Sequence, residues 1–125
     1  MLDVKKLLTK ICSVLGLYEA TTTTTTYGTL YVQRVFNAVT VTFDGNSSAL
    51  TRSAYTKLFT LGANARPSAS IRFVAYDNVT SDVTKALLMG YVNTSGECYV
   101  WVFGNSGTNV APRFSVTFLK QGSLT

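Results

Sequence analysis

Histidine is absent from this 125-residue chain, and charged residues make up only 14% of it. The lack of histidine excludes Ser-His and Cys-His catalytic pairs and every metal site that is built on imidazole. Charged residues normally account for about 25% of a globular protein, so the low share here indicates a surface of mainly neutral polar groups. No apolar run approaches the roughly 18 residues of a membrane span, so we expect no membrane insertion.

Cysteine and proline are also scarce, with two of each. Cys12 and Cys98 form no CxxC motif and cannot complete a four-ligand metal site without histidine. We therefore expect neither a metal nor a cofactor. A disulfide between the two stays open, but a pair of reduced, buried thiols fits the pattern better and suits assembly in a reducing cytoplasm.

The net charge is +5, from 11 Lys and Arg against 6 Asp and Glu. A basic balance can indicate a nucleic-acid partner. Outside the N-terminal segment, however, the basic residues are spread singly along the chain. None of them forms a cluster with stacking aromatic residues, as a nucleic-acid surface requires. We therefore expect no nucleic-acid binding.

Residues 2 to 17 have the one clear helical pattern, which we assign to an N-terminal helix (stem) over residues 1–18. Asp3 suits the start of the helix and Gly16 its end. Two heptads are too short to hold a coiled coil alone, so the apolar stripe either packs on the domain's own core or supports self-association together with another surface. The stripe consists of Val4, Leu7, Ile11 and Val14 at a/d spacing, widened by Leu8 and Leu15.

Six consecutive threonines, Thr21 to Thr26, lack the apolar alternation of a half-buried strand. We interpret residues 19–26 as a Thr-rich linker, with an edge strand that begins inside the tract as the competing interpretation. From residue 27 to residue 125, period-two segments alternate with turn signals, which predicts one head domain. The expected strands are 27–36, 38–44, 54–61, 70–76, 84–92, 97–103 and 113–119.

This spacing of short strands, with no crossover helices, predicts an all-β fold. We expect a jelly-roll-like antiparallel β-sandwich preceded by the short helix. The strand from Cys98 to Phe103 is unusual because both of its faces are apolar. The face formed by Tyr99, Trp101 and Phe103 is covered by a loop, by a neighbouring subunit or by a sugar, and the residues alone leave all three open.

The six acidic residues give little support for catalysis, and we expect that this protein is not an enzyme. A glycosidase needs two carboxylates that face each other across a cleft, and Asp77 and Asp82 are better explained as turn residues. Ligand binding is easier to support, because exposed rings beside amides and charges are typical of sugar sites. The candidates are Tyr55, Arg72, Tyr76, Asp77, Asn105 and Asn109, with Trp101 as a further ring.

The opening segment, from Leu2 to Ile11, resembles the start of short bacteriophage or prophage tail-fibre and minor tail proteins from gut bacteria. The rest of the chain shares their layout of Thr-rich strands, with a hairpin that leads into the aromatic strand at Tyr99 and Trp101. The resemblance implies a homo-oligomer, commonly a trimeric jelly roll, that resides in the virion tail and attaches to host-surface glycans or to other phage tail proteins. No receptor-binding motif carries over residue by residue.

Together these features lead to the hypothesis of a phage tail-fibre or baseplate-associated head protein. The stem stripe and the aromatic face would associate copies, and the head would bind a host-surface saccharide or an adjacent tail protein. A purely structural virion adaptor or decoration protein is the main alternative. A small glycan-active enzyme that uses Asp77, Asp82 or Glu97 is the third.

Overall fold

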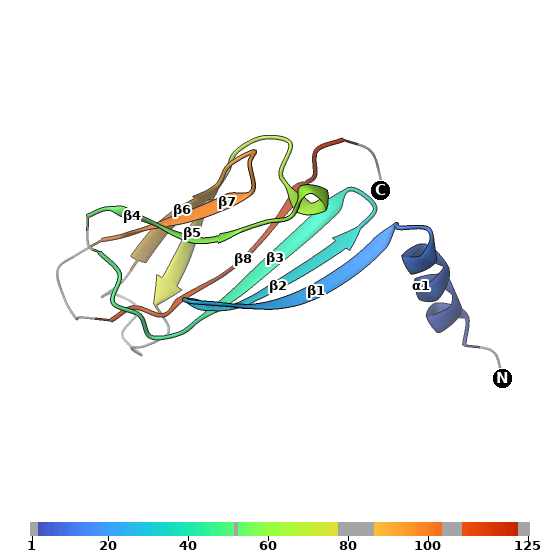
Figure 1. Ribbon diagram of the computed structural model, residues 1–125, viewed down its shortest axis with the longest axis horizontal. Helices are drawn as coiled ribbons and strands as arrows, with labels where there is room; N and C mark the ends of the chain where they lie inside the picture. The colour runs from blue at the N-terminus through green and yellow to red at the C-terminus, as the bar shows by residue number, and fades with distance from the viewer. Residues whose placement is uncertain (1–2, 52, 78–86, 104–108, 123–125) are drawn as a thin grey trace.

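A computed structural model describes residues 3–51, 53–77, 87–103 and 109–122. One α-helix precedes a series of β-strands, and a short 3₁₀ helix, η1 (Ala63–Ala65), interrupts the series (Figure 1). The elements are α1 (Val4–Val14), β1 (Tyr18–Thr25), β2 (Gly28–Val35), β3 (Ala38–Gly45), β4 (Tyr55–Thr60), β5 (Ile71–Asp77), β6 (Leu87–Val92), β7 (Glu97–Val102) and β8 (Pro112–Leu119).

The strands of the described residues form one eight-stranded sheet in the order β1-β2-β3-β8-β5-β6-β7-β4, and each neighbouring pair is antiparallel. The ladder between β5 and β8 is short, with the pairs Tyr76–Arg113 and Asp77–Pro112. At this short ladder the half made of β5, β6, β7 and β4 curls over the half made of β1, β2, β3 and β8 (Figure 1). The sheet is therefore a curled half-barrel with β1 and β4 at its two edges.

The core lies between the two halves of this sheet and follows the period-two pattern of the sequence. Val39, Val41 and Phe43 of β3 are fully buried, and Val100 and Val102 of β7 face them from the other half. Four phenylalanine rings fill the centre, with ring centroids 4.2–6.3 Å apart in the contacting pairs. These rings are Phe43, Phe59, Phe73 and Phe114.

The antiparallel all-β class and the preceding helix are confirmed. The expected strands 27–36, 38–44, 54–61, 70–76, 97–103 and 113–119 correspond to β2, β3, β4, β5, β7 and β8 within one or two residues. Strand 84–92 corresponds to β6, and its residues 84 to 86 lie outside the described residues. The jelly-roll order of strands is not evident, because one continuous sheet takes the place of two separate ones.

The assignment of residues 19–26 to a linker was wrong, because Tyr18–Thr25 form β1 and pair with β2 along their whole length. β-branched threonine favours extended backbone, and the turn after Thr25 leads directly into β2. The strand lacks apolar alternation because most of its residues are exposed. The head therefore begins near residue 18 instead of residue 27.

The helix α1 has well-formed ends. The Asp3 carboxylate accepts a hydrogen bond from the Lys6 N–H at 3.1 Å, which caps the N-terminus. At the C-terminus Gly16 adopts φ 75°, and Leu17 N–H donates to Cys12 C=O at 2.7 Å. This arrangement is a Schellman motif, in which glycine relieves the strain of a left-handed residue. No helix in the described part of the chain is both long and apolar enough to cross a bilayer.

Candidate functional site

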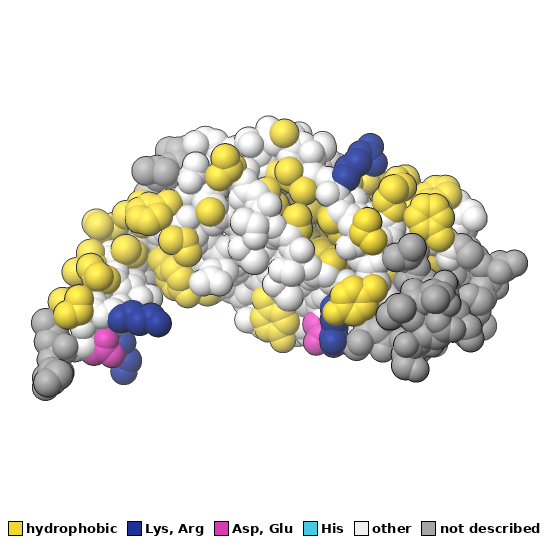
Figure 2. Space-filling model, turned by 180° about the vertical axis from the view of Figure 1, so that it is seen from behind, with side chains coloured by type: hydrophobic (Ala, Val, Ile, Leu, Met, Phe, Trp, Pro, Cys, Tyr) yellow, Lys and Arg dark blue, Asp and Glu magenta, His cyan; other side chains and the backbone are white. Residues whose placement is uncertain are grey.

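The apolar stripe of α1 lies on the surface. No residue of this fully described helix is buried, and the stripe residues range from Leu7 at 41% exposed to Val14 at 79%. The helix projects from one end of the head (Figure 1), with apolar side chains along one side and lysines along another (Figure 2). The expectation that the stripe packs on the domain's own core is therefore wrong.

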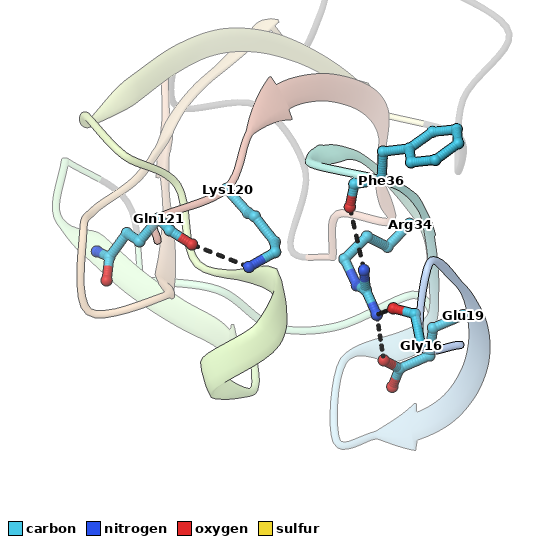
Figure 3. Close-up of polar contacts among 6 residues, drawn as sticks. All are labelled: Gly16, Glu19, Arg34, Phe36, Lys120 and Gln121. Atoms are coloured by element: carbon cyan, nitrogen blue, oxygen red, sulfur yellow. Dashed lines mark hydrogen bonds and ion pairs between the residues drawn. The ribbon is translucent and has the colours of Figure 1, made fainter. Parts of the chain in front are cut away.

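A buried arginine holds the base of this helix to the sheet (Figure 3). Arg34 of β2 is 3% exposed, and its guanidinium donates to the carbonyls of Phe36 at 3.0 Å and Gly16 at 2.8 Å. The same group pairs with the Glu19 carboxylate at 3.3 Å. Gly16 belongs to the helix stop, so these contacts set where α1 leaves the head. At the same end of the molecule, Lys120 Nζ donates to the Gln121 carbonyl at 3.0 Å.

A second surface feature is a cluster of four rings on the outer face of β4, β6 and β7, which we call the aromatic platform. Tyr55 lies edge-on to both Tyr91 and Trp101, with ring centroids 5.1 Å apart in each pair. Tyr91 stacks on Tyr99 at 5.2 Å. The register explains the cluster, because Tyr55 is opposite Trp101 and Tyr91 is opposite Tyr99 across their ladders.

Charged groups border the aromatic platform. The Arg72 guanidinium lies over the Tyr91 ring, 5.7 Å from its centroid. The Glu97 carboxylate accepts hydrogen bonds from Asn93 at 3.3 Å and from the Tyr99 hydroxyl at 3.0 Å, with Lys57 at 3.7 Å. These two hydrogen bonds, followed by the Lys57 charge, lower the pKa of Glu97. The bond to Glu97 in turn raises the pKa of the Tyr99 phenol.

The aromatic platform is a partly exposed face with ring surfaces and hydrogen-bonding groups side by side. Tyr55 is 39% exposed, and the other three rings are half-buried against their neighbours. Aromatic faces stack on the C–H faces of sugars, and Trp, Tyr and Arg also dominate the energetics of protein interfaces. The arrangement can therefore bind a saccharide or a protein surface.

Several predicted site residues meet on this platform. Tyr55 and Arg72, expected to bind ligand, join Tyr99 and Trp101, expected to associate subunits, on one face. The sequence interpretation missed Tyr91, although alternation along β6 and the hairpin to β7 place it opposite Tyr99.

The remaining candidates do not join the aromatic platform. Asp77 is 8% exposed, and its carboxylate accepts a hydrogen bond from Ala111 N–H at 2.9 Å, which is a structural role. Tyr76 lies opposite Arg113 of β8. Phe103 is exposed beyond the end of β7, and Asn109 is exposed in the following loop. Asn105 lies outside the described residues, as does Asp82.

Both cysteines are free, Cys98 buried and Cys12 half-buried, so the expected burial holds fully for Cys98 alone. Burial raises the pKa of the Cys98 thiol. Within the described ranges, no three Cys, Asp or Glu side chains lie close enough to hold a metal ion. No protein-family model matches this chain, and no curated protein matches it.

Proposed function

We propose that this chain is an oligomeric, non-enzymatic binding head of a phage virion, associated with the tail fibre or baseplate. Copies associate through α1, as a trimer in the manner of the proteins that the N-terminal segment resembles. The head is the jelly-roll-like part of that assembly and binds a host-surface saccharide or an adjacent tail protein. This proposal rests on the chemistry of two surfaces and on the resemblance.

The single observation that carries the proposal is the exposed stripe of α1. Five large apolar side chains of a helix without buried residues, together with Leu15 at its C-cap, are exposed, and they are costly to leave in water at about 25 cal/mol for each Å² of apolar surface. A helix of 11 residues does not hold a coiled coil alone, so it needs support from the heads. Association of several copies satisfies both requirements.

The test of association is a matched pair of substitutions on α1 in the full chain. Ile11→Asp places a charge within the stripe, where association would leave it buried and unpaired. Thr9→Asp adds the same charge on the polar side of the helix. Light scattering should show that Ile11→Asp reduces the mass to that of one chain, whereas Thr9→Asp keeps the oligomer. Oligomers of equal mass and stability in both variants would contradict the role of α1.

The aromatic platform supports the binding half of the proposal. A glycan array probed with the oligomer should show selective binding that Trp101→Ala weakens, because three weak sites on one particle gain strongly from avidity. Thr60→Ala, on the exposed surface of neighbouring β4, serves as the control. An oligomer that binds no glycan would favour the architectural alternative, a virion adaptor or decoration protein.

A further inference from the structure

The open side of the half-barrel contains a groove of about 630 Å³ between the two edge strands. Its walls come from β1 and β4, which are far apart in the strand order but line the same space. Leu30, Phe59 and Leu61 form a buried apolar floor. Threonines of β1 line the rim, including Thr21, Thr23 and Thr25.

Among the residues that the structure describes, each wall of this groove is a strand with one unpaired edge. In the described chain, β1 pairs with β2 alone and β4 pairs with β7 alone. An unpaired edge presents a row of N–H and C=O groups that can accept another strand. Neighbouring strands lie about 4.8 Å apart, so the edge sets both the position and the direction of an incoming strand.

The two edges differ in how readily they can pair with an additional strand. β4 has a bulge between Lys57 and Phe59 and carries a lysine, and both features hinder the addition of a strand. β1 is eight residues long and pairs with β2 in an unbroken register. It contains neither proline nor lysine, and its threonines favour extended backbone. The edge of β1 is therefore the main pairing surface.

The β1–β2 ladder shows which groups of β1 face outward. Phe36 N–H donates to Leu17 C=O, which extends the register one pair beyond Tyr18 and Val35. Hydrogen-bonded pairs alternate in an antiparallel ladder, so the odd-numbered residues of β1 bond to β2. The even-numbered residues, Ala20, Thr22 and Thr24 among them, direct N–H and C=O to the free edge.

We propose that this groove binds an extended polypeptide segment of a partner protein, which adds as a strand antiparallel to β1. Its alternate side chains are apolar and face the floor at Leu30, Phe59 and Leu61, while the others are polar and face solvent. In the described sheet the strand direction reverses at every ladder, and β1 and β4 are the first and the last of eight strands. These two edge strands therefore run in opposite directions. The added strand is therefore parallel to β4.

A second copy of this chain does not suit the groove. A strand that pairs with β1 inside the groove has β4 on its other side, so no further strand of its own sheet can lie there. Every strand in the described part of this chain already uses at least one edge in its own sheet. The occupant is therefore a segment outside a folded sheet, such as a linker or a terminal tail of another protein.

The test uses a synthetic peptide, GTLYVQRV, that has the sequence of β2. This sequence is chosen because β2 is the strand that pairs antiparallel with β1 in the protein itself. Fluorescence anisotropy of the labelled peptide measures its binding to the full-length protein. Two control peptides carry N-methyl groups on alternate amides in opposite phase. Pairing through the main chain predicts that one of these phases weakens binding at least tenfold. Equal binding of all three peptides, or no binding at 1 mM peptide, would overturn the proposal.

The matched protein variants are Thr22→Pro and Thr22→Val. Proline removes an N–H that faces the free edge and leaves the bonds to β2 intact, whereas valine keeps that N–H. We expect Thr22→Pro to weaken peptide binding at least tenfold and Thr22→Val to change it less than twofold. Equal affinity in both variants would refute pairing along β1.

Hydrogen exchange on the wild-type protein removes any dependence on whether the proline variant folds. Peptide binding should slow exchange at the amides of Ala20, Thr22 and Thr24 and leave the odd-numbered amides of β1 unchanged. Protection confined to β4 would contradict the proposal. A change in oligomer mass in Thr22→Pro without peptide would show that a second copy occupies the edge, which would also overturn it. Protection confined to β4 has no bearing on association through α1, which Ile11→Asp tests separately.

Discussion

Replacement of Arg34 by methionine is the substitution whose consequence the structure defines most closely. Methionine keeps an unbranched apolar side chain in the buried position but removes the guanidinium, which bonds to the carbonyls of Gly16 and Phe36 and pairs with Glu19. A hydrogen bond to a charged group contributes about 1.5–3 kcal/mol. The pair with Glu19, whose side chain is 48% exposed, contributes at most about 1 kcal/mol.

The bonds to the two carbonyls therefore dominate, and we expect Arg34→Met to lower the free energy of unfolding by about 3 kcal/mol. With an unfolding entropy of about 2.1 cal/mol/K per residue, this loss corresponds to a fall in Tm of roughly 11 °C. Glu19→Gln is the matched control, and its cost should stay below about 1 kcal/mol.

Calorimetry of both variants provides the measurement, and limited proteolysis near Leu17 provides the second readout. Loss of the bond to Gly16 should release the base of α1 and speed cleavage there in Arg34→Met alone. An unchanged Tm in Arg34→Met, or an equal loss in Glu19→Gln, would refute this reasoning. The second result would mean that the ion pair, and not the carbonyl bonds, holds the helix in place.

Three further predictions concern Glu97, Gly90 and the two cysteines. The pKa of Glu97 is lowered on folding, so its contribution to stability is complete above the unfolded value of about 4.3 and is lost as pH falls through the lowered pKa. In Glu97→Gln the urea midpoint of unfolding should therefore decrease less below about pH 4 than it does in the wild type. An equal decrease in both proteins would contradict this prediction. A Cβ at Gly90 would overlap the Phe73 ring, so Gly90→Ala should cost about 1–3 kcal/mol by urea unfolding, and a neutral result would show that the ring moves aside. A thiol reagent should modify only Cys12 of the native protein quickly, because burial shields the Cys98 thiol and raises its pKa. Cys12→Ser should therefore abolish the fast reaction, and rapid modification of Cys98 would contradict the fold.

The strands from residue 28 onward could be predicted because their alternation is strong and their turns contain glycine, asparagine and aspartate. Val39, Val41 and Phe43 show this directly, since every second residue of β3 is buried. The helix could also be predicted, together with its stop at Gly16. These features depend on local pattern and local turn chemistry.

The threonine tract and the path of the sheet could not be predicted in the same way. Thr21 and Thr23 show no alternation because polar residues line the groove as well as the solvent face, so β1 looked like a linker. The curl of the sheet depends on the two-pair ladder at Tyr76 and Asp77, a long-range contact that leaves no local signal. The aromatic platform required the register of three strands, which is why Tyr91 was missed.

The proposal depends above all on association of the intact chain, and its mass in solution tests this most directly. Light scattering on the wild-type protein should give three times the chain mass of 13.6 kDa at micromolar concentration. A mass of one chain at every concentration tested would mean that the stripe of α1 does not associate with other copies of this chain. That result would contradict the proposed oligomeric head.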